Sequence, residues 1–398
     1  MRIASVVGAR PNFVKIAPLL REMRRHRQIT PVLVHTGQHY DEAMSEQFFR
    51  DLEIEPPASN LGVGSGSHAV QTAEVMRRLD PLLVDLAPDL VLVVGDVNST
   101  LAAALTAAKR GIPVAHVEAG LRSFDRRMPE EINRVLTDAI ADVLFATEQS
   151  GCDNLVREGM PRDKIRLVGN VMIDALELFR GRWERSAIFD VVGLAPEEPY
   201  AVVTLHRPSN VDETATLAGY LRALNELSRH LPVIFPVHPR VRSHLAAGDR
   251  AAGGGAVASG GRDRGIFFLD PLGYFDFIAL LSQARIALTD SGGVQEETTA
   301  LGVPCLTLRD TTERPVTVTH GTNRVIGSDP DRLVTEALRT LADPPVQRGR
   351  PPLWDGQAAR RIVDALRETH GGRSDSPRIG REPVRLGAGA KGGGSGSS

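Results

Sequence analysis

The 398-residue chain contains only two cysteines, Cys152 and Cys305, which stand far apart and lack the spacing of metal ligands. This scarcity argues against a disulfide framework and a zinc site, and it fits a reducing, cytoplasmic compartment. The sequence also lacks an apolar stretch long enough to span a membrane, and Met1 is followed by a strand-like run rather than a signal-peptide pattern. We therefore expect a soluble protein that has no membrane partner.

An excess of charge of one sign is missing as well. The 47 Lys and Arg residues nearly balance the 49 Asp and Glu residues, which disfavours nucleic-acid binding through bulk charge but leaves room for a local basic pocket. No Gly-x-Gly-x-x-Gly follows the first predicted strand, where Gly8-Ala9-Arg10-Pro11 stands instead. A dinucleotide-binding fold is therefore disfavoured.

Short apolar runs alternate with helix-like segments along most of the chain. Strands are predicted at residues 3–7, 30–36, 90–95, 114–118 and 143–146, and again at 200–205, 233–237, 266–269, 286–289 and 305–308. This alternation predicts an α/β protein with parallel sheets covered by helices on both faces. Two series of similar length indicate two doubly wound domains that face each other. Ligands in such folds bind at the carboxyl ends of strands, which here means the cleft between the domains.

One segment of the second series suits an anion. The strand at 286–289 leads into the turn Ser291-Gly292-Gly293, and a helix is predicted from Val294 to Leu301. Glycines allow close backbone approach, and a helix N-terminus offers free N–H groups to a diphosphate. Glu296 and Glu297 would lie in the first turn, where the helix dipole favours carboxylates, or one would accept hydrogen bonds from a ribose. An ordinary strand–turn–helix with Ser291 as its cap is the alternative.

Cations follow the first strand. Pro11 is expected at the first helical position, which leaves Arg10 in the loop and Lys15 one turn into the helix. Both could contact phosphate oxygens in the cleft. The alternative is a solvated pair at a helix start.

Three acidic positions follow predicted strands or begin a helix. Asp96, Glu118 and Glu130 each have a structural explanation: a cap for the helix near Asn98, a pair with Arg122, and a favourable first helical turn, respectively. Their convergence at one sheet edge would raise their proton affinities and suit acid–base catalysis.

Two histidines occupy comparable positions in the second series. His206 and His238 follow adjacent predicted strands, and Arg314 follows a third. A single histidine is often only a structural hydrogen-bonding group, but this set is typical of phosphate ligands. Because no carboxylate-rich constellation accompanies the histidines, we predict no metal.

The motifs, taken in order, resemble the non-hydrolysing UDP-N-acetylglucosamine 2-epimerases over residues 1 to 368. They are Gly-Ala-Arg-Pro (8–11), Gly-Asp (95–96), His-Val-Glu-Ala-Gly-Leu-Arg (116–122), Pro-Glu-Glu-Ile-Asn-Arg (129–134), Gly-Asn-Val-Met-Ile-Asp (169–174), Leu-His-Arg (205–207), Asp-Ser-Gly-Gly-Val-Gln-Glu-Glu (290–297) and Arg-Asp-Thr-Thr-Glu-Arg-Pro (309–315). The resemblance implies a glycosyltransferase-B-like fold of two Rossmann-like domains. It also implies a homodimer with a UDP-sugar substrate and neither metal nor nicotinamide cofactor.

The resemblance further implies roles for individual residues. UDP would be eliminated to leave a 2-acetamidoglucal and then re-added, giving UDP-N-acetylmannosamine. The expected catalytic residues are Asp96, Glu118, Glu130 and His206. The expected substrate-binding residues are Arg10, Lys15, His238, Phe277, Ser291, Gly292, Gly293, Glu297 and Arg314.

The chain divides into four expected parts. Residues 1–169 form the domain with the acid–base carboxylates, and residues 170–353 form the UDP-binding domain. A terminal helix at 354–370 is expected to pack back on the first domain. The Gly/Ser/Arg-rich tail at 371–398 is expected to be disordered.

Two positions depart from the pattern of many bacterial members. The sequence has Gln38-His39-Tyr40 in place of Gln-His-Arg, and Glu74 where a later Arg aligns. These changes put activation by a second substrate molecule in doubt. Three other functions stay open: a glycosyltransferase of the same fold, a hydrolysing epimerase, and a non-catalytic nucleotide-sugar sensor. An epimerase for a modified UDP-amino sugar is a further alternative.

Overall fold

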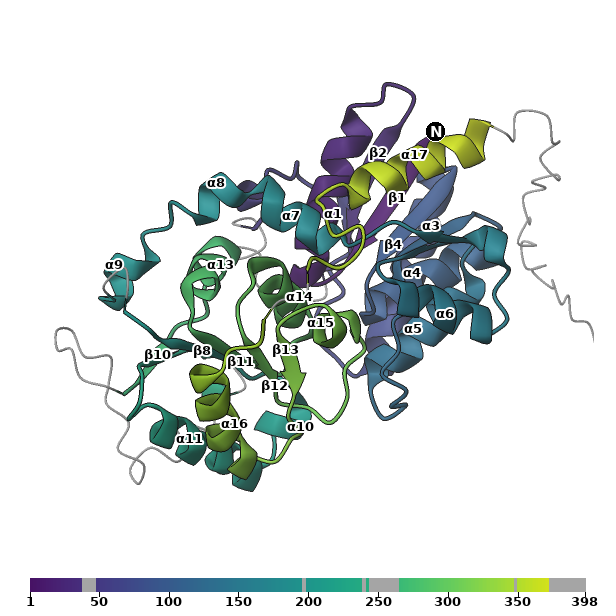
Figure 1. Cartoon of the computed structure of the whole chain (residues 1–398). Helices are drawn as coiled ribbons and strands as arrows, with labels where there is room; N and C mark the ends of the chain where they lie inside the picture. The colour runs from purple at the N-terminus through teal and green to yellow at the C-terminus, as the bar shows by residue number, and fades with distance from the viewer. Residues whose placement is uncertain (38–47, 195–197, 238–240, 243–264, 347–348, 372–398) are drawn as a thin grey trace, which may run out of the picture.

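The computed structural model describes residues 1–37, 48–194, 198–237, 241–242, 265–346 and 349–371, which form two lobes, each built on a parallel sheet (Figure 1). The first sheet has the strand order β3-β2-β1-β4-β5-β6-β7, and the second has the order β10-β9-β8-β11-β12-β13. The predicted fold class, two doubly wound domains, is confirmed. His238 and the segment Gln38-His39-Tyr40 lie outside the described residues.

The strands of the first sheet are β1 (Arg2–Val7), β2 (Thr30–His35), β3 (Ser59–Asn60), β4 (Leu90–Val94), β5 (Val114–Ala119), β6 (Val143–Ala146) and β7 (Ile165–Leu167). Those of the second are β8 (Ala201–Thr204), β9 (Val233–Pro236), β10 (Ile266–Leu269), β11 (Ile286–Thr289), β12 (Cys305–Thr307) and β13 (Asn323–Val325). The central strands are mostly apolar because helices cover both faces; every residue of β4 is apolar and buried. The sequence did not predict β3, β7 and β13, which are edge strands of two or three residues.

Helices connect the strands and cover the sheets. In the first lobe they are α1 (Arg10–Arg24), α3 (His68–Leu86), α4 (Asn98–Lys109), α5 (Pro129–Ile140) and α6 (Gln149–Arg157). The linking and second-lobe helices are α7 (Val171–Leu178), α8 (Arg180–Trp183), α9 (Ile188–Val192), α10 (Pro208–Val211), α11 (Thr214–Leu227), α13 (Tyr274–Gln283), α14 (Gly292–Leu301), α15 (Val316–Thr319) and α16 (Asp331–Ala342). The terminal helix is α17 (Ala358–Gly371).

Two helices join the lobes. Helix α7 packs against both α1 and α14, and α17 packs against α1 and α7 (Figure 1). The carboxylate of Asp174 on α7 accepts hydrogen bonds from the backbone N–H groups of Ala358 (3.0 Å) and Ala359 (2.6 Å). Asp174 therefore satisfies donors that the first turn of α17 would otherwise leave unpaired. One continuous apolar core includes side chains from both sheets, so the lobes are packed together rather than loosely tethered.

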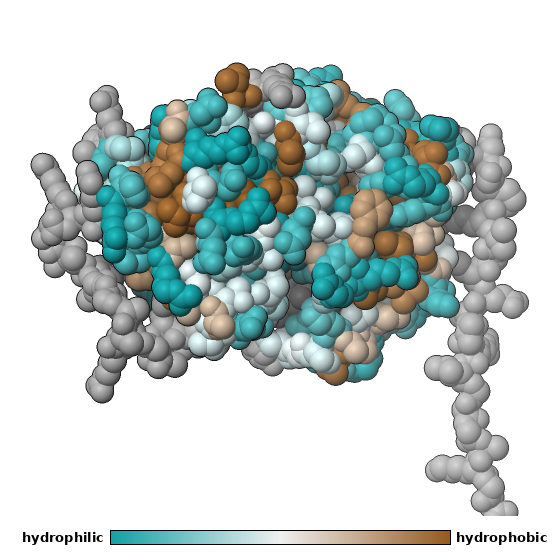
Figure 2. Space-filling model, turned by 60° about the horizontal axis from the view of Figure 1, so that its bottom comes forward, coloured by the Kyte–Doolittle hydropathy of each residue, from teal (hydrophilic) through white to brown (hydrophobic). Residues whose placement is uncertain are grey.

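Figure 2 shows the molecule turned from the view of Figure 1 so that its bottom comes forward, and no single apolar region dominates this face. Hydrophilic and hydrophobic residues are intermixed there, and a narrow hollow lies between the lobes (Figure 2). Among the described helices, none is long and apolar enough to cross a membrane.

Candidate active site

Glu118 lies at the carboxyl end of β5, where the pairing with β6 is interrupted by a bulge between Val117 and Ala119. Its backbone adopts φ 76°, which costs a non-glycine residue on the order of 1–3 kcal/mol. Such a bulge re-aims the side chain. The Glu118 carboxylate forms ion pairs with Lys15 and, at 2.8 Å, with the Arg314 guanidinium of the second lobe.

Arg122 is not the partner of Glu118. It pairs instead with Asp138 at 2.7 Å and with Glu158 at 2.6 Å. The structural explanation of Glu118 as a partner of Arg122 is therefore wrong. The carboxylate of Glu118 contacts two cations that the sequence had placed in the cleft.

Lys15 is buried on α1 beside Glu118. Burial alone would lower the pKa of its ammonium group, but Glu118 and Glu296 outweigh burial and raise the pKa above the usual value. The helix begins at Arg10 rather than after it, so Arg10 is helical and the predicted loop position is wrong. The Arg10 guanidinium lies over the ring of Phe48, 5.7 Å from its centroid.

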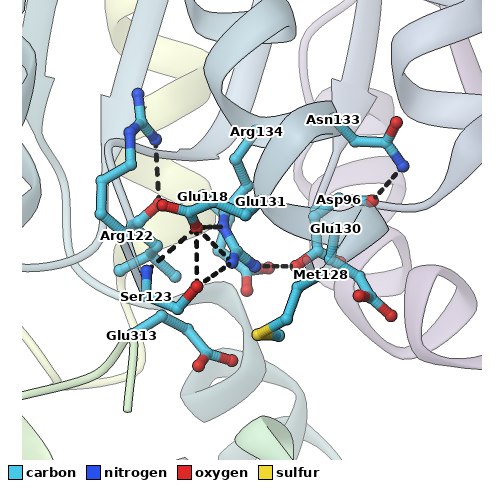
Figure 3. A network of polar contacts seen from close by, with 12 residues as sticks. Asp96, Glu118, Arg122, Ser123, Met128, Glu130, Glu131, Asn133, Arg134 and Glu313 are labelled. Atoms are coloured by element: carbon cyan, nitrogen blue, oxygen red, sulfur yellow. Dashed lines mark hydrogen bonds and ion pairs between the residues drawn. The ribbon is translucent and has the colours of Figure 1, made fainter. Parts of the chain in front are cut away.

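Asp96 follows β4 and pairs with Arg134 of α5 at 2.5 Å (Figure 3). It does not cap α4, because the N-cap is Val97 and no side chain makes the capping bond. Burial would raise the pKa of Asp96, but Arg134, Lys15 and Arg314 outweigh it and hold the pKa below the usual value. The predicted increase in proton affinity is therefore wrong for Asp96. The nearby cations affect its carboxylate more strongly than the nearby carboxylate of Glu313 does.

The two glutamates at the start of α5 have different environments. Glu131 is buried and accepts hydrogen bonds from the backbone N–H groups of Ser123 and Phe124, each at 2.9 Å, while pairing with Arg134 (Figure 3). It fixes the preceding loop. The Glu130 side chain is 37% exposed and lies 3.6 Å from Arg207 of the second lobe, so it is the one that faces across the cleft.

In the second lobe, Asp290 orients His206. The buried Asp290 carboxylate lies 2.8 Å from Nδ1 of His206 and accepts backbone hydrogen bonds from His206 and Arg207. The pKa of Asp290 is lowered, because His206 and these bonds outweigh the effect of burial. The position of the His206 ring is thus fixed from its Nδ1 side.

Helix α14 starts two residues earlier than predicted, at Gly292. Glu296 and Glu297 therefore lie in the second turn, and the dipole explanation for them is wrong. Ser291 is the N-cap residue but makes no side-chain capping bond. A Cβ on Gly292 would lie 2.8 Å from Cζ of Arg314, so any larger residue there would displace the Arg314 guanidinium.

Arg314 connects the two lobes electrostatically. Besides Glu118, its guanidinium pairs with Glu296 at 2.6 Å and with Glu313 at 2.5 Å. Burial would lower its pKa, but these carboxylates raise the pKa well above the usual value. Glu313 lies in turn 3.9 Å from Arg207. Lys15, Glu118, Glu130 and Arg314 are thus brought into one network of ion pairs.

Glu297 differs from its neighbour Glu296. It is buried, and burial together with the charge of Glu296 raises its pKa to about 8. It is therefore mostly protonated at neutral pH in the structure. Phe277 lies on α13, which packs against α14, and Gly293 has only ordinary contacts around it.

Comparison with known proteins identifies the family. A family model described as UDP-N-acetylglucosamine 2-epimerase matches residues 21–367. The chain belongs to this family.

Individual relatives in the 2-epimerase family align over nearly their full length. A UDP-N-acetylglucosamine 2-epimerase of Methanococcus maripaludis is 37% identical, covering 92% of this chain and 98% of that protein. A UDP-2,3-diacetamido-2,3-dideoxy-D-glucuronate 2-epimerase of Pseudomonas aeruginosa is 39% identical, covering 92% and 99%. The solved structure of Methanocaldococcus jannaschii UDP-GlcNAc 2-epimerase with UDP-GlcNAc and UDP is 38% identical, covers 92% of this chain and 100% of that chain, and has a TM-score of 0.83.

Sequence reasoning gave no role to three charged residues of this epimerase site, Arg134, Asp290 and Glu313, and did not predict that Glu296 pairs with Arg314. Arg134, Asp290, Glu296 and Glu313 all stand inside the motifs that indicated the family. The signal that could have found them is their burial: charged side chains in apolar surroundings need partners. In the part of the chain that the structure describes, no group of three His, Cys, Asp or Glu side chains is arranged to hold a metal.

Proposed function

We propose that the protein is a non-hydrolysing 2-epimerase that interconverts UDP-N-acetylglucosamine and UDP-N-acetylmannosamine. The supporting observation is the contact between Glu118 of the first lobe and Arg314 of the second, at 2.8 Å, with Lys15 beside it. A candidate base and the cations suited to a leaving diphosphate therefore share one cleft.

The reaction needs both kinds of group. The C2 hydrogen of the sugar is not adjacent to a carbonyl, so direct removal by a carboxylate is too slow. UDP instead leaves C1 with the electron pair of the C1–O bond, and a carboxylate takes the C2 proton as a C1–C2 double bond forms. Re-addition of UDP to C1, with a proton delivered to the opposite face of C2, gives the other epimer.

The residues can be assigned to these steps. Lys15 and Arg314 stabilise the negative charge of the departing diphosphate. Asp96 is ionised, because its cationic neighbours lower its pKa, and this suits a base. Asp96 or Glu118 takes the proton in one direction, and Glu130 or His206 serves in the other.

UDP is assigned to the second lobe. Ser291, Gly292 and Gly293 stand at the N-terminus of α14, which suits the diphosphate together with Arg10 and His238. Glu297, buried on the same helix, is assigned to the ribose hydroxyls, and Phe277 to the uracil.

The sugar carried by UDP has two candidates. Relatives named for UDP-N-acetylglucosamine and a relative named for UDP-2,3-diacetamido-2,3-dideoxy-D-glucuronate are similarly identical to this chain, at 37% and 39%. The unmodified sugar is proposed first, because the family model is described as UDP-N-acetylglucosamine 2-epimerase and the cited structure is a complex with UDP-GlcNAc. The diacetamido uronate is the second candidate.

Proton NMR of each UDP-sugar with the enzyme in D₂O tests the proposal. Deuterium at C2, with UDP still attached in both epimers, is the expected result. Release of free sugar would indicate a hydrolysing epimerase. An unchanged C2 signal with both sugars would favour a glycosyltransferase or a sensor.

We also propose a cytoplasmic homodimer that supplies a precursor for polysaccharide synthesis. Ile132 and Leu136 of α5 are each 46% exposed and lie one turn apart on the helix surface. Exposed apolar side chains in a group fit a surface that is covered by a second copy. Two free cysteines suit a reducing compartment.

A further inference from the structure

His116 is completely buried in β5, two residues before Glu118, and both of its ring nitrogens face oxygen atoms. Nδ1 lies 2.6 Å from a carboxylate oxygen of Asp138 on α5. Nε2 lies 2.9 Å from the backbone carbonyl oxygen of Gly95. No role in the proposed chemistry has been given to this histidine.

Asp138 has several donors around it. Besides His116, its carboxylate accepts from the backbone N–H of Gly120 at 3.0 Å and pairs with Arg122 at 2.7 Å. Burial would raise the pKa of Asp138, but His116 and Arg122 outweigh it and hold the pKa below the usual value. Asp138 is therefore ionised and acts only as an acceptor.

The contacts of His116 then determine its charge. A carbonyl oxygen and an ionised carboxylate both accept hydrogen bonds, so each ring nitrogen must donate. Only the doubly protonated imidazolium has two N–H groups. A neutral ring would leave one nitrogen facing an acceptor in a buried site, which is costly.

The two hydrogen bonds of His116 lead to backbone groups next to the candidate catalytic residues. One goes to Gly95 directly, and the other goes to Asp138, which bonds to Gly120. Gly95 directly precedes Asp96, and Gly120 follows Glu118 by two residues. The backbone φ angle is positive at Gly95 (73°), Glu118 (76°) and Gly120 (82°). Glycine adopts such angles readily, but the backbone of Glu118 is strained and persists only where its surroundings determine it. His116 and Asp138 supply such contacts, because they bond to Gly95 just after β4 and to Gly120 just after β5.

We propose that His116, held as an imidazolium by Asp138, is a positioning residue that fixes the ends of β4 and β5 and so sets the placement of Asp96 relative to Glu118. This rests on the proposed epimerase function. His116 touches no reacting atom and acts through the backbone of Gly95 and, via Asp138, of Gly120.

Two substitutions of His116 test its two hydrogen bonds one at a time. The amide nitrogen of His116→Asn can replace Nδ1 and keep the bond to Asp138, whereas that of His116→Gln can replace Nε2 and keep the bond to Gly95. We expect each variant to lower kcat by about 10- to 100-fold, as small displacements of catalytic groups do. The KM and the Kd for UDP should change by less than about threefold, since the α14 turn assigned to UDP lies in the other lobe and the two bonds of His116 go to Asp138 and Gly95 rather than to Arg10 or Lys15.

Thr106→Val is the matched control. It removes a buried hydroxyl bond, 2.7 Å to the Ala102 carbonyl, from α4 of the same lobe without touching either strand end. Thr106→Val should lower Tm with kcat unchanged. If both His116 variants kept the kcat of the control, or lost UDP affinity in step with Tm, the positioning role would be wrong.

Nitrogen-15 NMR of histidine-labelled wild-type protein tests the charge without any variant. The His116 resonance, assigned by its loss in His116→Asn, should show both ring nitrogens protonated at pH 7.5. A neutral tautomer would overturn the proposal. C2 exchange in wild-type protein, measured in the same series, separates the two ideas: no exchange there contradicts the epimerase function, whereas equal exchange in wild type and variants contradicts positioning.

Discussion

At the scale of single residues, the site depends on buried charges that satisfy one another. Glu118 reaches Lys15 and Arg314 only because a bulge and a positive φ turn its side chain out of the β5 pattern. Asp96 is kept ionised by Arg134, with Lys15 and Arg314 nearby. The same cations that suit a diphosphate therefore also help to lower the pKa of Asp96.

The carboxylates can be tested by isosteric substitution. Asp96→Asn and Glu118→Gln should each lower kcat by about 100-fold or more, because each removes a carboxylate that either takes the proton or pairs with the cations of the site, while keeping the shape of the side chain. Steady-state kinetics and UDP titration check this, and UDP affinity should be retained. Asp80→Asn, which breaks a surface pair with Arg110, is the control and should leave kcat unchanged. Near-normal turnover in Asp96→Asn, Glu118→Gln and Glu130→Gln alike would refute the assignment.

Glu297 predicts a pH-dependent stability. Its folded pKa of about 8 exceeds the ordinary value of 4.5, so the folded state binds more protons between these pH values and loses stability as pH rises through them. Glu297→Gln removes this titration. When the pH is raised from 5 to 9, the free energy of unfolding of wild type should therefore fall by on the order of 2–4 kcal/mol more than that of the variant. Urea unfolding at both pH values measures the difference, and a constant offset would contradict the assigned pKa.

At the scale of elements, the site is built from strand ends and one helix start. The sequence predicted β4, β5, β8 and β11 because each is a short, mostly apolar run, and residues at or just after their carboxyl ends do meet in the cleft. It misplaced the start of α1 by one residue and that of α14 by two. Helix starts are harder to predict because their caps, Ala9 and Ser291, make no side-chain bond that a sequence pattern could reveal.

Gly292 tests the start of α14. In Gly292→Ala the new Cβ would lie 2.8 Å from Cζ of Arg314 and 2.9 Å from Oε1 of Glu313, so Arg314 must move. We expect stability to fall by about 1–3 kcal/mol and UDP affinity to fall with it. Thermal unfolding and calorimetric titration with UDP measure both. Gly181→Ala, whose Cβ meets nothing closer than 3.8 Å, should change neither binding nor turnover; unchanged UDP affinity in Gly292→Ala would contradict the proposed cradle.

At the scale of the whole molecule, two lobes share one apolar core and one ionic network. The two-domain architecture was predictable because strand–helix alternation is a strong local signal. The pairing of Glu118 with Arg314 was not, since residues 196 positions apart meet only after both sheets form. The exact partners of Arg122 and Asp96 were missed because Asp138 and Arg134 lie on α5, which meets these strand ends only through packing within the first lobe. The site was thus predictable as a set of strand-end residues, and its geometry was not.

The proposed dimer predicts a concentration-dependent mass. Leu136→Asp should shift the particle from two chains toward one, because a charge replaces an exposed apolar group at the proposed contact. Sedimentation velocity measures this. Val191→Asp, on an even more exposed apolar residue of α9, is the control and should leave the dimer intact. A monomeric wild type, or a Leu136→Asp variant as dimeric as wild type, would contradict the proposed interface.

Positional isotope exchange tests the central claim most directly. A UDP-N-acetylglucosamine carrying ¹⁸O in the bridge between C1 and the β-phosphorus is incubated with the enzyme and followed by ³¹P NMR. If UDP leaves C1 inside the closed cleft and returns, the label must spread into the non-bridging β-phosphate oxygens of the recovered nucleotide sugars. Epimerised product with all of its ¹⁸O still in the bridge would contradict the account.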